Sequence, residues 1–87
     1  MIEISMPTQP IVQAIQAAQS DGGPAHPMEI TGASLDSGIV RYQVRAGGQD
    51  QILEDKADVV LSFLHVIRGR LVDVSFDPAG LVSFTLA

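Results

Sequence analysis

Two histidines, His26 and His65, are the side chains of this sequence that could exchange protons near neutral pH. His65 lies in the nearly unbroken apolar run DVVLSFLHVIRG, whereas His26 lies in GGPAHP, a segment whose glycines and prolines predict a loop. If the apolar run is a helix, His65 falls on its polar side, beside Asp58 and Ser62. We therefore expect the His65 imidazole near solvent rather than in a buried catalytic site.

No set of residues predicts catalysis, a metal centre or a cofactor. The chain contains no cysteine, which excludes thiol nucleophiles, disulfides and Cys-ligated metals. The two histidines show no HxH or HxxxH spacing, and the serines lack a GxSxG context. The phosphate-binding patterns GxxxxGK[ST] and GxGxxG are also missing. We expect a protein that is not an enzyme and has no catalytic residue, metal ligand or cofactor.

An acidic cluster surrounds the start of the helix predicted for the apolar run. A calcium loop would need closely alternating oxygen ligands and an internal glycine, which this segment lacks. Asp55 can instead cap the helix, with Asp58 near the positive end of its dipole. The alternative is a docking patch for a basic partner. The cluster consists of Asp50, Glu54, Asp55 and Asp58.

Val59, Phe63 and Val66 widen the apolar arc of that helix beyond a single stripe facing the core. One interpretation is that a neighbouring loop or the C-terminal hairpin covers this flank. The other is that it is a candidate interface with a protein partner, most simply a second copy of the chain.

The first part of the chain predicts a strand and a helix. Ile2–Ser5 is a short alternating segment, and Thr8 is a suitable helix N-cap with Pro10 in the first turn. Apolar residues then recur at helical spacing until Ser20-Asp21-Gly22-Gly23 ends the helix. That stripe consists of Ile11, Ala14, Ile15 and Ala18.

The next strands form a hairpin around Asp36-Ser37-Gly38, which suits a three-residue loop with Gly38 in the left-handed conformation. Pairing Leu35 with Ile39 then places Ile30 opposite Val44 and Gly32 opposite Tyr42. A further short strand, Gln51–Leu53, precedes the helix that Asp55 caps and Gly69 ends.

The last two strands form a second hairpin, which turns at Asp77-Pro78-Ala79-Gly80. Its register brings six large apolar residues onto one face. The predicted pairs are Phe76 with Val82, Val74 with Phe84, and Val72 with Leu86.

These elements predict an α+β fold in the order β-α-β-β-(β)-α-β-β, within a single domain spanning residues 1–87. The expected architecture is a two-layer sandwich with two helices packed on one antiparallel sheet. The order contains the β-α-β-β-α-β succession of a ferredoxin-like sandwich, with one extra C-terminal strand. If Ile2–Ser5 is not a strand, two helices on one antiparallel sheet remain.

The charge and hydropathy of the sequence argue against two classes of protein, those that bind nucleic acid and those that span a membrane. The net charge of −5 argues against direct nucleic-acid binding, and no apolar stretch approaches the length that spans a membrane. MIEIS lacks the features of a signal peptide, so a cytoplasmic protein is expected. The leading hypothesis is a small non-enzymatic protein–protein interaction module, regulatory or accessory, with a protein or its own copy as partner. The alternative is a small acidic inhibitor of the phage type, blocking a basic nucleic-acid-binding surface of a host or defence protein.

Overall fold

The computed structural model describes residues 1–19, 27–66 and 69–87. Both His26 and the predicted helix end at Ser20–Gly23 lie outside these residues. In the described part, two helices and six strands confirm the predicted α+β fold. They are β1 (Ile2–Pro7), α1 (Thr8–Gln19), β2 (Met28–Asp36), β3 (Ile39–Ala46), β4 (Gln49–Lys56), α2 (Ala57–Phe63), β5 (Leu71–Asp77) and β6 (Leu81–Leu86).

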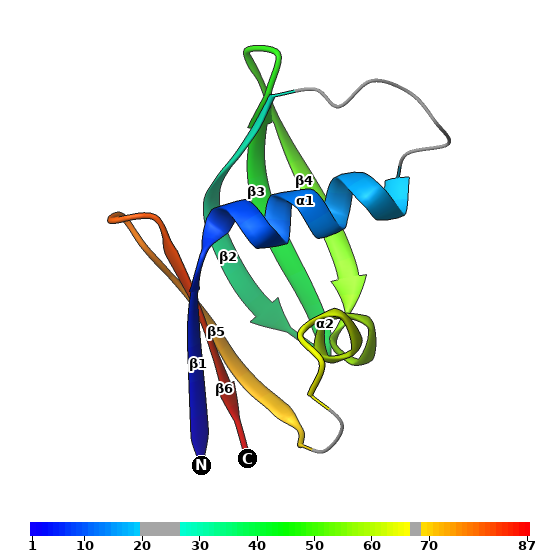
Figure 1. Ribbon diagram of the computed structural model, residues 1–87, viewed down its shortest axis with the longest axis vertical. Helices are drawn as coiled ribbons and strands as arrows, with labels where there is room; N and C mark the ends of the chain where they lie inside the picture. The colour runs from blue at the N-terminus through cyan, green and yellow to red at the C-terminus, as the bar shows by residue number, and fades with distance from the viewer. Residues whose placement is uncertain (20–26, 67–68) are drawn as a thin grey trace.

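The six strands form two antiparallel sheets, so the prediction of one sheet was wrong. The strand orders are β1-β6-β5 and β2-β3-β4, and the sheets adjoin where β2 lies beside β5 (Figure 1). The ferredoxin-like arrangement is not confirmed. Alternation along a strand identifies its apolar face but not its neighbours. Here the extra C-terminal strand, β6, lies between β1 and β5.

The β1-β6-β5 sheet has one apolar face and one polar face. Ile4 pairs with Phe84, which also pairs with Val74, so large side chains meet across three strands. This confirms the strand at Ile2–Ser5 and most of the predicted C-terminal hairpin. The exception is Val72: the register shifts between Leu71 and Asp73, and Leu71 takes the predicted place opposite Leu86. Val72 is therefore exposed, because a bulge residue is left out of the pairing.

The β2–β3 hairpin follows the predicted register only at its far end. Ile30 lies opposite Val44, but Gly32 lies opposite Gln43 rather than Tyr42. The register shifts between Ile30 and Gly32, which leaves Thr31 as a bulge. The predicted three-residue loop is consequently a two-residue turn between paired Asp36 and Ile39.

Strand β4 is longer than the predicted strand Gln51–Leu53 and includes residues at which the sequence predicts the start of a helix. It follows β3 through a two-residue turn in which Gly47 and Gly48 both have positive φ, 59° and 78°. A Gly-Gly pair between two strands is a known hairpin signal. Asp55 is thus part of β4 and not the N-cap of α2; Lys56 holds the N-cap position and makes no side-chain capping bond.

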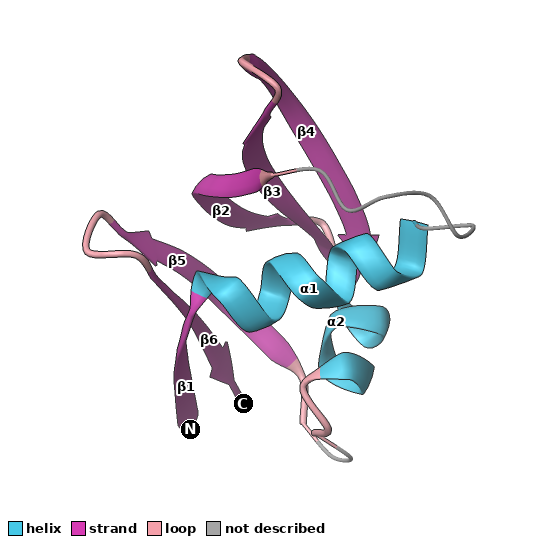
Figure 2. Cartoon of the chain, turned by 45° about the horizontal axis from the view of Figure 1, so that its top comes forward, coloured by secondary structure: helices cyan, strands magenta, loops and turns pink. Residues whose placement is uncertain are grey.

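Both helices contribute to one apolar core. Ile11, Val12 and Ile15 of α1 are buried, as are Val60 and Leu61 of α2. Figure 2 shows α1 lying across the space in front of the two sheets, with α2 beside the far end of β4. From the sheets, the core receives Ile30, Val40, Tyr42, Val44, Leu71, Val74, Val82, Phe84 and Leu86. Within the described residues, neither helix is long and apolar enough to cross a membrane.

Candidate functional site

Helix α2 ends at Phe63, six residues before the predicted end at Gly69. His65 lies beyond the helix, in the left-handed region with a φ of 59°, and is exposed. The expected solvent-facing histidine is thus observed, but its place on the polar side of a continuous helix is not. Backbone geometry, rather than helical periodicity, orients this side chain.

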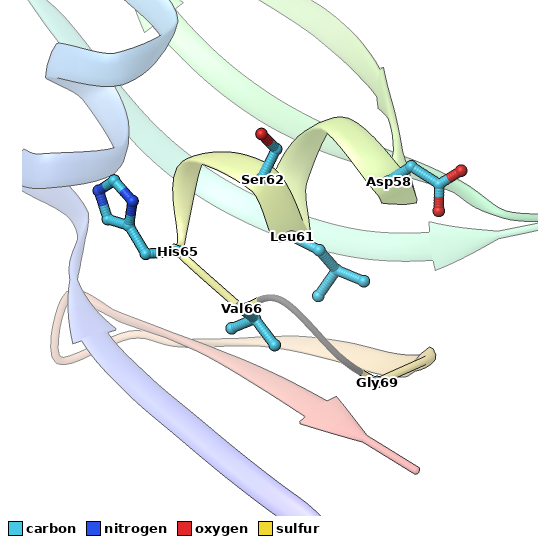
Figure 3. A pocket seen from close by; sticks show the side chains of 6 residues that line it. All are labelled: Asp58, Leu61, Ser62, His65, Val66 and Gly69. Atoms are coloured by element: carbon cyan, nitrogen blue, oxygen red, sulfur yellow. The ribbon is translucent and has the colours of Figure 1, made fainter.

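A pocket of about 480 Å³ opens beside α2. Asp58, Ser62 and His65 line it, the residue types of a hydrolytic triad, but Figure 3 shows their side chains pointing in different directions. No hydrogen bond joins any two of these side chains in the part of the chain described by the structure. Nucleophilic catalysis requires nucleophile and base within hydrogen-bonding reach. The arrangement does not support such chemistry.

The candidate interface residues Val59, Phe63 and Val66 do not form one exposed surface. Phe63 and Val66 are partly buried and pack against the core. Val59 is 50% exposed. The core therefore covers part of Phe63 and of Val66, so the three residues are not equally accessible to a partner. A partner contact at Val59 stays a prediction.

The acidic cluster predicted from the sequence is divided among different surfaces. Asp50 and Glu54 lie opposite Arg45 and Arg41, on the outer face of the β2-β3-β4 sheet. Asp55 lies opposite the fully buried Val40, so its side chain is on the inner face. Asp58 is in the first turn of α2. The structure does not bring the four carboxylates together. Their use in docking stays a prediction.

The arginines of β3 form ion pairs with acidic residues of both neighbouring strands, β2 and β4. The Arg41 guanidinium lies 2.8 Å from Asp36 and 3.1 Å from Glu54, and the Arg45 guanidinium lies 3.0 Å from Asp50. Hydrogen bonds from Arg41 and from the Ser37 hydroxyl hold the pKa of Asp36 below its usual value. The outer face of this sheet thus carries charged side chains in defined positions.

Ile52 is an exposed apolar residue that the sequence analysis did not single out. It lies on the same outer face, opposite Gln43 and between Asp50 and Glu54, and is 62% exposed. The missed signal was the Gly47-Gly48 turn: once it is read as a two-residue hairpin, pairing Ala46 with Gln49 places Ile52 on the outer face.

On the inner face, the hydroxyl of Tyr42 is buried and has no hydrogen-bond partner among the described residues. Burial raises the pKa of this phenol, and the nearby Asp55 carboxylate raises it further. A neutral phenol at this position is suited to the core and not to acid–base chemistry. Nor do any three His, Asp or Glu side chains of the described residues form a group that could hold a metal ion.

Comparison of the chain with protein-family models, with curated proteins and with solved structures finds no match.

Proposed function

We propose that the protein is a small, non-enzymatic protein–protein interaction module whose contact surface is centred on Ile52. The observation that supports this is an isoleucine 62% exposed between two arginine–carboxylate groups. Protein interfaces commonly surround an apolar centre with a polar rim. Fully burying such a side chain is worth roughly 1.5–3 kcal/mol, which a partner could recover.

The arrangement of charges supports recognition of a structured protein surface. Because Arg41 binds two carboxylates, its side chain is held in place before any partner arrives. Preorganised side chains lose less conformational entropy on binding. Gln43 adds an uncharged hydrogen-bonding group beside Ile52.

The test uses partner capture followed by matched variants. The tagged chain is used to isolate proteins from its native host, and each purified candidate is titrated against Ile52→Ser and Val59→Ser. We expect Ile52→Ser to raise the dissociation constant about tenfold. Val59→Ser tests the competing interface predicted from the sequence at α2. It should change the dissociation constant less than about threefold, because the proposed contact surface lies on the outer face of the β2-β3-β4 sheet. Equal effects of the two variants would contradict the proposal.

A second candidate function, the acidic inhibitor, is favoured by the outer face of the β1-β6-β5 sheet. These three strands contain no Arg, Lys or His, and Glu3, Asp73 and Asp77 belong to their polar face. A surface of one sign suits a basic partner such as a nucleic-acid-binding protein. Asp73→Lys should then weaken binding and reduce its salt dependence, whereas Ile52→Ser should leave it unchanged.

A further inference from the structure

Strand β4 presents a free edge. Among the residues that the structure describes, it is the terminal strand of its sheet and pairs only with β3 (Figure 1). Its first four residues, Gln49–Ile52, are all exposed, including those whose side chains are on the inner face. An unpaired strand edge offers a row of backbone donors and acceptors to another strand.

The side chains of β4 carry an incomplete charge pattern on the outer face. Glu29, Arg45 and Asp50 lie in one row across the three strands and alternate in sign. The row stops at β4, so a cation beyond Asp50 would continue it. At the other end of β4, Lys56 makes no ion pair with any residue in the described part of the chain.

We propose that β4 pairs antiparallel with β4 of a second copy, about a two-fold axis at Leu53. Each Asp50 then faces the partner's Lys56, and the two copies form one continuous six-stranded sheet. The inference rests on the proposed function, because it names a second copy of this chain as one partner of the interaction module. In this register, Gln51 faces the partner's Asp55, Ile52 faces the partner's Glu54, and Leu53 faces the partner's Leu53.

The charges of β4 disfavour the neighbouring registers. An axis at Ile52 would place Asp50 opposite the partner's Glu54, and an axis at Glu54 would place two copies of that carboxylate opposite each other. Like charges directly opposite in a sheet are destabilising. Opposite residues must also share a face of the sheet, so registers between these are excluded. The axis at Leu53 avoids like charges and forms two Asp50–Lys56 pairs.

Asp55 fits the same register on the inner face. A charged side chain pointing inward from an edge strand normally discourages pairing with other chains. In the proposed dimer, Asp55 lies opposite the partner's Gln51, whose amide can donate a hydrogen bond to the carboxylate. Asp55 therefore disfavours pairing of the β4 edge with other strands but is compatible with pairing to a second copy of β4.

A cysteine scan along β4 reads the register directly, because the chain contains no cysteine of its own. Gln51, Ile52, Leu53 and Glu54 are each changed to Cys, and disulfide-linked dimer is measured after mild oxidation. Only Leu53→Cys places the new thiol opposite itself at the axis. We expect its yield to exceed that of the other variants several-fold. A maximum at another position, or equal yields at all four, would overturn the proposed register.

Charge complementation gives a second test that leaves Leu53 intact. In sedimentation equilibrium at about 100 µM, the wild-type chain should dimerise. Asp50→Lys and Lys56→Glu should each raise the dimer dissociation constant at least tenfold, since each creates two like-charge contacts. An equimolar mixture of the two variants should recover the dimer, because both contacts become attractive. Failure of the mixture to recover would refute the pairing of Asp50 with Lys56.

Matched controls carry the same charge changes on the other sheet. Asp73, in β5, and Arg70, directly before β5, are both exposed. The variants Asp73→Lys and Arg70→Glu should dimerise like the wild type. The proposed function is tested separately by Ile52→Ser against a captured partner. A monomeric wild-type chain whose partner binding depends on Ile52 would overturn the self-pairing and leave the interaction module standing. A wild-type chain that dimerises but has no partner whose binding depends on Ile52 would overturn the interaction module and leave the self-pairing standing.

Discussion

The backbone N–H of Val66 donates to the carbonyl oxygen of Leu61 at 3.0 Å. Between them, the N–H of His65 donates to the carbonyl oxygen of Ser62 at 3.1 Å. This pair of bonds is the Schellman motif that ends many helices. It requires a left-handed residue at the position of His65, where glycine is the usual choice. The left-handed backbone conformation of His65 is therefore explained by the helix end.

Replacing His65 with glycine should stabilise the protein. A non-glycine residue at positive φ costs about 1–3 kcal/mol, and the added flexibility of glycine in the unfolded chain offsets part of this. We expect His65→Gly to raise the free energy of unfolding by about 1 kcal/mol, measured by urea denaturation.

Two further substitutions at position 65 separate the effect of the backbone conformation on stability from the effect of the imidazole. His65→Asn should stay within about 0.5 kcal/mol of the wild type, because asparagine tolerates the left-handed region. His65→Val should lose about 1–2 kcal/mol, because a β-branched residue does not. A loss of stability in His65→Gly would instead show that the imidazole contributes to the fold.

The sequence predicted most elements of this fold because alternation and turn residues determine them locally. The turn at Asp77–Gly80 and the pairing of Val74 with Phe84 were correct. The errors at Thr31 and Val72 have one cause. A bulge shifts every later pair by one residue, and neither position carries a glycine or another residue that marks it. The helix end at His65 was missed for a related reason, since no glycine stands there.

The proposed contact surface was less predictable because it depends on which strands are neighbours. Asp50 and Glu54 read as helix capping or a solvated patch until Arg45 and Arg41 are placed opposite them. Ile52 looks like a core residue in any assignment that leaves Gln49–Lys56 without a partner strand. Such cross-strand pairs join residues distant in sequence, which local periodicity does not reveal.

Tyr42 should make the protein sensitive to alkaline pH. Burial raises the pKa of its phenol in the folded state, whereas an unfolded tyrosine ionises near pH 10. The raised folded-state pKa means that this contribution to stability is complete below about pH 10 and is lost as the pH rises further. Tyr42 is the only tyrosine, so phenolate absorbance near 295 nm should appear only together with unfolding. Ionisation near pH 10 in the folded chain would contradict this.

Removing the Tyr42 hydroxyl should not weaken the fold at neutral pH. The hydroxyl is buried without a hydrogen-bond partner among the described residues, so it contributes a desolvation cost and no compensating bond. Tyr42→Phe should leave the free energy of unfolding unchanged or raise it by up to about 1 kcal/mol. The same variant should lose the part of the alkaline destabilisation that depends on the phenol.

The β2–β3 turn should respond to residues that favour positive φ. Ser37 and Gly38 have φ values of 53° and 76°, as a type I′ turn requires. Ser37→Asn should raise the free energy of unfolding by about 0.5 kcal/mol, and Gly38→Ala should lower it by about 1 kcal/mol. Gly32→Ala is the control: its new Cβ would meet the flexible end of the Gln43 side chain, so thermal unfolding should change little.

Arg41 should control the acid titration of Asp36. The carboxyl has a pKa below its usual 3.8, chiefly because Arg41 donates a hydrogen bond to it and secondarily because Ser37 does. A lowered folded-state pKa stabilises the fold above the unfolded value and loses this effect as pH falls toward the folded value. Arg41→Gln should therefore move the Asp36 pKa up toward 3.8, measured by NMR of the carboxyl carbon, and make stability less dependent on pH in this acid range. Arg45→Gln is the control, because it removes the separate ion pair with Asp50. This variant should leave the Asp36 titration unchanged. A similar shift in both variants would mean that the overall charge of the sheet face, and not the Arg41 contact, lowers the pKa of Asp36.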